Sequence, residues 1–217
     1  MILSAFRAPI QPEVVLQAAI AYAIIVLLCL PLHEFAHAWT ALQLGDRTAY
    51  YQGRVTLDPR AHIDPMGALL LAVASFGWAK PVPFVPHQLR KAPSIKTGIL
   101  LVSVAGPLMN ILLAALAAIP LRLGVAGGIL ATILNLIVYI NLILAVFNLI
   151  PLAPLDGSKV LWALMPSSWS RTFDQIQQYS LFILLALVLI PAGPGGSLLS
   201  QIINPPVSAL YGLLLGF

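Results

Sequence analysis

Two histidines and a glutamate interrupt an otherwise apolar stretch near the N-terminus, in the order His33-Glu34-Phe35-Ala36-His37. The i, i+4 spacing places both imidazoles on one face of a helix, where they can hold the same tetrahedral zinc ion. Glu34 lies about 100° around the helix from His33, close enough to contact a water at the metal without binding the metal. Ionisable side chains are costly inside a membrane, so the cluster indicates a functional site. The alternative is a pair of core histidines, with Glu34 paired to a basic loop residue.

A hydrolytic zinc site needs a third protein ligand, and Asp156 is the candidate carboxylate. A catalytic zinc takes three protein ligands and keeps one position for water. Asp156 follows Pro151 and Pro154, which should end the preceding helix and leave the carboxylate on an irregular turn. The alternative is that Asp156 only caps the next short helix, because Asp before Gly and Ser is common in turns.

The composition is that of an integral membrane protein. Of the 217 residues, 60% are hydrophobic and only 8% are charged, whereas about a quarter of the residues of a soluble domain are charged. The eleven basic and seven acidic residues give a net charge of +4. The basic residues lie mainly in short loops beside apolar runs, which indicates membrane orientation rather than nucleic-acid binding. Cys29 is the only cysteine, which excludes an intrachain disulfide and a cysteine-rich metal site.

We expect an all-α polytopic membrane protein with about five to six transmembrane or re-entrant helices. Residues 1–217 form one membrane-embedded unit, with a catalytic core at about 12–165 and accessory helices at about 176–217. The run from Met66 to Trp78 is predicted to be re-entrant or interfacial, because about 13 residues are too few to cross. Longer runs, of which the first three are the stronger candidates to cross, extend over Pro12 to Leu44, Ile95 to Pro120, Gly127 to Ile150, Ser180 to Pro191 and Ser197 to Phe217.

A small membrane-associated β element is predicted after the first helix. Apolar and polar residues alternate from Tyr51 to Leu57, with the period of a strand. An irregular interfacial loop is the alternative. A strand here could hold an unwound substrate by strand addition, which makes Arg54, Val55 and Thr56 candidate substrate-binding residues.

The orientation in the membrane follows from the same site. If the short run after Met66 does not cross, the first and third long helices run in the same direction and bring His33 and Asp156 to one face. Arg7 and Arg122 then lie outside and the other basic residues lie at or near the inner face, as the positive-inside rule requires. We therefore expect the site to open toward the cytoplasmic side.

Three further residues are expected to serve the helices rather than the chemistry. Gly106 should permit close helix approach, and Asn110 should make an interhelical hydrogen bond. Pro31 deletes a helical hydrogen bond to the carbonyl of Leu27, which should distort the first helix just before the site.

The sequence resembles the site-2 protease family of intramembrane zinc metalloproteases, in particular its short bacterial members without a PDZ or nucleotide-sensing domain. The resemblance spans about Leu32 to Lys159 and depends on several motifs together. These are His33 to His37, Gly53 to Pro59, His62 to Gly67, Phe76 to Pro83, Ala105 to Asn110 and Asn148 to Gly157.

This resemblance implies one zinc ion per chain, with His33, His37 and Asp156 as its ligands. Glu34 would be the catalytic base, and Asn148 a polar group near the bound substrate. The implied activity is an endopeptidase of the bacterial cell membrane that cuts transmembrane or membrane-tethered proteins within or next to their spans. Such substrates include membrane-bound regulators and signal-peptide remnants.

Two other functions are the alternatives. A catalytically silent zinc-binding membrane protein would capture partner helices without cutting them, but a structural zinc needs a fourth ligand rather than the base Glu34. A metal transporter would need a chain of polar residues across the bilayer, which the sequence lacks.

Overall fold

The computed structural model describes residues 12–74, 77–193 and 196–216, so Arg7 and Phe76 lie outside the described residues. Its regular structure is helical, and no strand occurs in the part of the chain that it describes. Four helices are long and apolar enough to cross a membrane, namely Leu16–Gln43, Ile95–Arg122, Gly128–Asn148 and Leu198–Leu215. The expected all-α polytopic membrane architecture is thereby confirmed.

The first span consists of three segments, α2 (Pro12–Ile24), η1 (Ile25–Cys29) and α3 (Leu30–Gln43). In η1, a turn of π-helix, the N–H of Leu30 donates to the carbonyl of Ile25. Pro31 follows and has no N–H, so it cannot form the regular helical bond to Leu27. The irregularity expected just before His33 is therefore present as a π-helical turn, a feature often found at functional sites.

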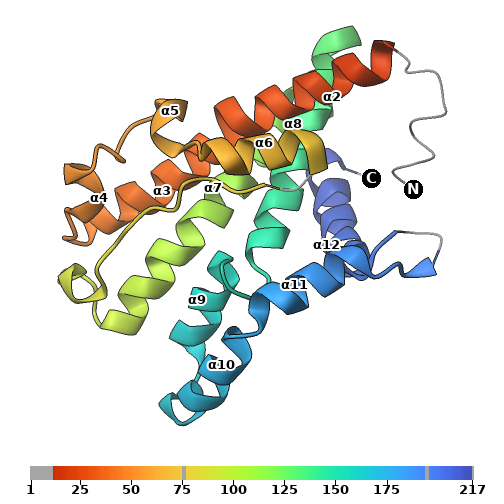
Figure 1. Cartoon of the computed structure of the whole chain (residues 1–217). Coiled ribbons are helices and arrows are strands. Elements are labelled where there is room, and N and C mark those ends of the chain that lie inside the picture. The colour runs from red at the N-terminus through yellow and green to blue at the C-terminus, as the bar shows by residue number, and fades with distance from the viewer. Residues whose placement is uncertain (1–11, 75–76, 194–195, 217) are drawn as a thin grey trace.

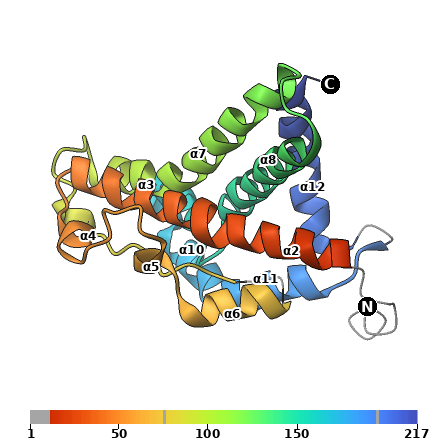
Figure 2. The same cartoon turned by 90° about the horizontal axis from the view of Figure 1, so that it is seen from above.

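The next two spans, α7 (Ile95–Arg122) and α8 (Gly128–Asn148), pack against each other, and α7 also packs against α3. Both views show α7 and α8 side by side and crossing the first span at an angle (Figures 1 and 2). Small residues are buried along α7, including Gly98, Gly106, Ala114 and Ala118. They allow the backbones of neighbouring helices to approach closely, which is how helices associate within lipid.

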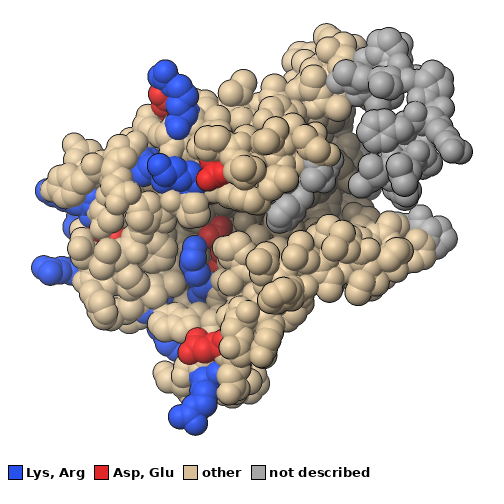
Figure 3. All heavy atoms as spheres, in the orientation of Figure 1, with Lys and Arg blue, Asp and Glu red and all other residues tan. Residues whose placement is uncertain are grey.

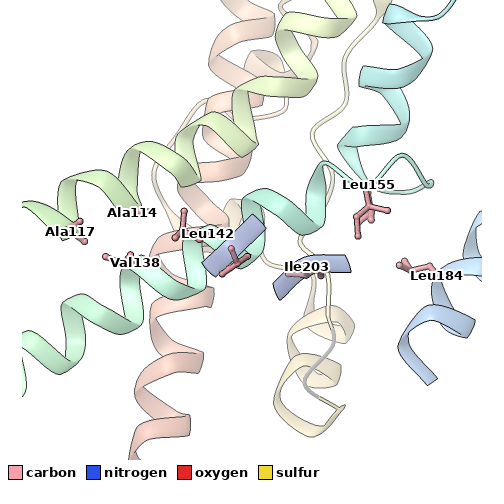
Figure 4. Packing of buried hydrophobic residues seen from close by; sticks show 10 residues of the cluster. Ala114, Ala117, Val138, Leu142, Leu155, Leu184 and Ile203 are labelled. Carbon is pink, nitrogen blue, oxygen red and sulfur yellow. The ribbon is translucent and has the colours of Figure 1, made fainter. Parts of the chain in front are cut away.

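The C-terminal helices complete the apolar core. α11 (Ser180–Leu189) forms a bent pair with the segment Ser167–Gln177, at an angle of 57°, so it crosses the membrane only if the pair is one broken span. α12 (Leu198–Leu215) continues through Pro205 and Pro206 and packs on α7 and α8. Figure 4 shows the core residues that join these elements, which are Ala114, Ala117, Val138, Leu142, Leu155, Leu184 and Ile203.

Short helices and one extended segment connect the first span with α7. These elements are α4 (Thr48–Tyr51), α5 (Pro59–His62), α6 (Pro65–Ala74) and the extended residues 77–85. α6 has 10 residues, too few to cross a membrane. It lies beside α2 in both views (Figures 1 and 2), and the hydroxyl of Tyr22 donates to the carbonyl of Ala68 over 3.1 Å. This agrees with a re-entrant or interfacial segment after Met66.

The predicted strand from Tyr51 to Leu57 is wrong. α4 ends at Tyr51, and Gly53, just beyond the C-cap Gln52, has a φ of +66°. The N–H of Gly53 donates to Tyr50 and the N–H of Arg54 donates to Ala49, over 3.0 and 2.9 Å. This is the Schellman pattern of a helix C-terminus, so the backbone groups that a strand would offer to a partner are satisfied within the turn.

The extended chain lies instead at Trp78–Val85. Pro81 and Pro83 keep this segment out of a helix, and Ala79 forms an isolated antiparallel bridge with Ile63. Arg54 is buried and holds the segment in place. Its guanidinium donates to the carbonyl of Pro81 over 2.9 Å and to the carbonyl of Lys80.

Arg54→Lys should loosen this segment. A single ammonium group cannot reproduce the guanidinium fork that joins two adjacent carbonyls, and each charge-assisted hydrogen bond contributes about 1.5–3 kcal/mol. We expect amide hydrogen exchange in residues 77–85 to become roughly tenfold faster or more. Arg90→Lys, at an exposed position, is the matched control, and equal exchange in the two variants would contradict the tether.

Candidate metal centre and active-site cavity

The structure brings the side chains of His33, His37 and Asp156 together at the end of the first span. Their separation in sequence reaches 123 residues, and all three are buried. The Nε2 atoms of His33 and His37 are 3.1 Å apart. The Oδ2 atom of Asp156 lies 3.2 Å from the first and 3.0 Å from the second.

The outer nitrogens of both imidazoles bind acceptors. Nδ1 of His33 lies 2.6 Å from Oδ1 of Asn110, and Nδ1 of His37 lies 2.7 Å from the carbonyl of Val102. A carbonyl oxygen can only accept, so each Nδ1 carries the proton and donates. Each Nε2 therefore presents a lone pair toward the other imidazole and toward Asp156.

A relay of amides fixes the orientation of Asn110. Its Nδ2 donates to Oδ1 of Asn141 over 2.7 Å, and Nδ2 of Asn141 donates to the carbonyl of Ile137 over 2.8 Å. Because the chain of donors ends on a backbone carbonyl, Oδ1 of Asn110 must face His33. Asn110 thus makes the expected interhelical bond, and it also orients a candidate metal ligand, which the sequence did not predict.

These three side chains fit a zinc ion. Two nitrogen lone pairs and a carboxylate oxygen meet at 3.0–3.2 Å with no proton to share between them, an arrangement that a cation stabilises. Ligand atoms at about 2.0–2.2 Å from a tetrahedral zinc lie about 3.3 Å from one another, close to the observed spacing. His33, His37 and Asp156 are also the three residues of the described chain whose possible ligand atoms all lie within 4.8 Å.

The chain after α8 carries Asp156 to this point. α8 ends at Asn148, and α9 (Asp156–Leu164) begins with Asp156 itself, with an irregular turn containing a cis peptide bond before Pro154 between them. Leu155, rather than Asp156, is the N-cap residue of α9. Oδ1 of Asp156 faces the ammonium of Lys159 at 3.5 Å, while Oδ2 faces the histidines.

Gly106 lets α7 pass directly beneath the two imidazoles. A Cβ atom at this position would lie 2.6 Å from Nε2 of His33 and even closer to Nε2 of His37. A side chain larger than hydrogen would therefore occupy the space between the imidazoles and α7. The close helix approach expected of Gly106 serves the candidate metal ligands themselves.

A cavity of about 370 Å³ opens beside the three ligands. Its wall includes Glu34, which is 9% exposed, together with Asn148 and Ser103. The extended segment also lines the cavity, through residues from Gly77 to Phe84. Figure 3 shows a hollow on this face of the molecule, with acidic atoms in its floor and a basic side chain beside them.

The other predicted substrate-binding residues differ in their placement. Asn148 lines the cavity, and its Nδ2 donates to the carbonyl of Leu144 over 2.9 Å. Arg54, Val55 and Thr56 do not line it. Arg54 instead binds the extended segment that lines the cavity. The carbonyl of Thr56 accepts a hydrogen bond from Nε2 of His62 over 2.8 Å.

His62 is a buried structural residue. It is fully buried, and burial lowers the pKa of its imidazole below the ordinary value, although the hydrogen bond to Thr56 opposes this shift. The neutral imidazole therefore suits its buried position at the end of α5.

Ser103 is a cavity residue that the sequence did not reveal. Its hydroxyl is buried and has no hydrogen-bond partner among the described residues, although it lines the cavity. Buried polar groups are nearly always paired, so the unpaired hydroxyl is available to bind a group that enters the cavity. Ser103, Gly106 and Asn110 are spaced i, i+3 and i+7, so they lie on one face of the helix. This shared face is the sequence signal that could have identified Ser103.

Gly106→Ala should abolish zinc binding, because the added methyl group displaces both imidazoles. We expect metal analysis of the purified protein to give less than about a tenth of the wild-type zinc per chain, given the geometry that zinc demands. Gly127→Ala is the matched control, since no atom lies within 4 Å of a Cβ there. One zinc per chain in both variants would show that the helix does not approach the imidazoles as closely as described.

Asn110→Leu should weaken zinc binding while leaving the three ligands in place. Without Oδ1 of Asn110, Nδ1 of His33 loses its acceptor, and such losses typically cost 10–100-fold in metal affinity. Chelator competition would measure the change. Asn135→Leu, on α8 and hydrogen-bonded to Ala131 rather than to a histidine, should bind zinc as the wild type does.

Comparison with known proteins shows the family of this chain. A model described as "Peptidase family M50" matches residues 123–191. The Bacillus subtilis protein named "Putative zinc metalloprotease YwhC" is 39% identical over 171 residues, which are 75% of this chain and 77% of that protein. The Mycobacterium tuberculosis protein named "Putative zinc metalloprotease Rip2" is 34% identical over 171 residues, 76% of this chain and 65% of its own length.

No solved structure gives a significant match. The family assignment therefore rests on sequence similarity. This chain matches the Bacillus subtilis protein over more than two thirds of that protein's length. The chain therefore belongs to peptidase family M50, the site-2 protease family of membrane-embedded zinc metalloproteases.

Proposed function

We propose that the protein is an intramembrane zinc endopeptidase that hydrolyses peptide bonds within or next to transmembrane segments of membrane-bound proteins. The observation that carries this proposal is the convergence of Nε2 of His33, Nε2 of His37 and Oδ2 of Asp156 beside a cavity that also contains Glu34. Three ligands leave the fourth position of a tetrahedral zinc for water, which is the pattern of a catalytic site.

Each residue of the site has a separate task in this mechanism. His33, His37 and Asp156 would hold a zinc ion, which would supply Lewis-acid chemistry for the scissile carbonyl and for the attacking water. Glu34 takes a proton from that water and delivers it to the departing amine. Lys159 holds Oδ1 of Asp156, so that Oδ2 alone faces the histidines.

Two polar side chains of the cavity wall, Asn148 and Ser103, would bind the substrate backbone. Asn148 donates from Nδ2 to Leu144, which leaves its Oδ1 to accept an N–H of the substrate. The unpaired hydroxyl of Ser103 can donate to a substrate carbonyl. Both line the same cavity as Glu34.

The extended wall can hold a substrate that has left its helical conformation. A peptide bond in a helix is shielded, so the substrate must unwind and find new partners for its backbone. The N–H groups of Val82 and Phe84 have no acceptor among the described residues, and both residues line the cavity. Pro81 and Pro83 have no N–H, so from Pro81 to Phe84 the donors for an added strand come from Val82 and Phe84.

The charge distribution supports a site that opens toward the cytoplasm. In Figure 3 basic side chains gather over the part of the molecule that Figure 1 labels α4, α5, α9 and α10, while the part around α11 is free of them on this face. A concentration of Lys and Arg at one end is typical of the cytoplasmic side of a membrane protein.

Glu34→Gln tests the proposal against the alternative of a silent zinc-binding protein. The amide cannot accept the water's proton, so cleavage of detergent-solubilised single-span reporter proteins should fall about 10²–10⁴-fold. Zinc per chain should stay at the wild-type value, because Glu34 is not a ligand. His37→Ala, as a comparison, should lose both zinc and cleavage. Equal cleavage by wild type and Glu34→Gln would end the protease assignment.

A further inference from the structure

A second groove adjoins the catalytic cavity and shares part of its wall. It encloses about 960 Å³ between the extended segment, the start of α7, α9 and α10 (Ser170–Gln177). Val82, Phe84 and Lys159 line both the cavity and the groove. The two spaces therefore adjoin each other along this shared wall.

The groove has an apolar wall with two lysines. Its apolar side chains include Phe84, Ile99, Trp162 and Phe173, and none of the described residues that line it is acidic. The ammonium of Lys96 lies 5.5 Å from the centre of the Trp162 ring, and that of Lys159 lies 5.8 Å from the centre of the Phe84 ring. The surface thus combines sites for large apolar side chains with positive charge.

Lys96 lacks a counter-charge. Its ammonium donates to the carbonyl of Met165 over 2.6 Å, but it forms no ion pair with the described residues, whereas Lys159 faces Asp156 at 3.5 Å. A half-buried cation in apolar surroundings is stabilised by an anion. Lys96 also lies in the first turn of α7, where the helix dipole adds to the positive potential.

We propose that this groove binds the segment of the substrate that adjoins the scissile bond and selects large apolar side chains followed by an acidic residue, whose carboxylate pairs with Lys96. The proposal rests on the function proposed above and names a substrate class for it. Its position beside the catalytic cavity, with which it shares Val82, Phe84 and Lys159, favours a polypeptide over a lipid as the occupant. The basic flanks that are usual in membrane proteins would be repelled, so the groove would distinguish substrates from other spans.

Binding to an inactive variant tests the groove without cleavage. Two fluorescent peptides of equal length would carry the same apolar segment, Leu-Leu-Phe-Leu, followed by Asp-Asp in one and Asn-Asn in the other. Fluorescence anisotropy with detergent-solubilised, zinc-loaded Glu34→Gln protein should show at least fivefold tighter binding of the acidic peptide. Adding Lys96→Glu should remove or reverse this preference. Arg171→Glu, on α10 but outside the groove wall, should preserve it and so controls for overall charge.

The outcomes separate the groove from the protease assignment. Equal affinity for both peptides, or a preference that Lys96→Glu leaves unchanged, overturns the groove proposal even if the wild type cleaves reporters. Vesicles containing phosphatidylglycerol test a lipid as the occupant. If they abolish the preference for the acidic peptide, and if they do not affect peptide binding by the Lys96→Glu variant, the groove is a lipid site and the proposal is overturned. If the acidic preference holds but wild type and Glu34→Gln cleave reporters equally, the protease assignment fails instead.

Discussion

The meeting of three lone-pair donors in a buried cavity is the constraint on which the rest of the structure depends. Nε2 of His33, Nε2 of His37 and Oδ2 of Asp156 approach to 3.0–3.2 Å, and without a cation such a group would repel itself. The surrounding chain keeps them there. Val102 and Asn110 occupy the outer nitrogens of the imidazoles, Gly106 gives the rings space, and the turn after α8 delivers the carboxylate.

Hydrogen bonding inside the membrane links this site to the helix bundle. The relay from His33 through Asn110 and Asn141 to the carbonyl of Ile137 joins α3, α7 and α8. In lipid no water can replace a lost partner, so each polar side chain in a span needs one from the protein. The same bonds that hold three spans together thereby set which nitrogen of His33 faces the other two candidate ligands. The packing of these three helices and the tautomer of His33 are therefore coupled.

The failed strand prediction shows where periodicity misleads. Residues 51–57 alternate in polarity, yet local hydrogen bonds around Gly53 close a helical turn there. The extended wall lies at 78–85, where prolines rather than alternation determine the conformation. Arg54 remains important for a different reason from the one that first singled it out. It connects the helical turn to the extended wall, so the segment predicted to bind the substrate supports the segment that lines the cavity.

The sequence by itself determined the membrane class, the first three long helices, the close approach at Gly106 and the identities of the candidate zinc ligands. Those features depend on apolar length, i, i+4 spacing and residue chemistry, which are local. Only the tertiary structure decided the tautomers of the histidines, the unpaired hydroxyl of Ser103, the path of residues 77–85 and the groove with Lys96. Each of these depends on which side chains from distant segments meet. A helix fixes its own hydrogen bonds, whereas a side chain's partners are fixed only when the helices pack.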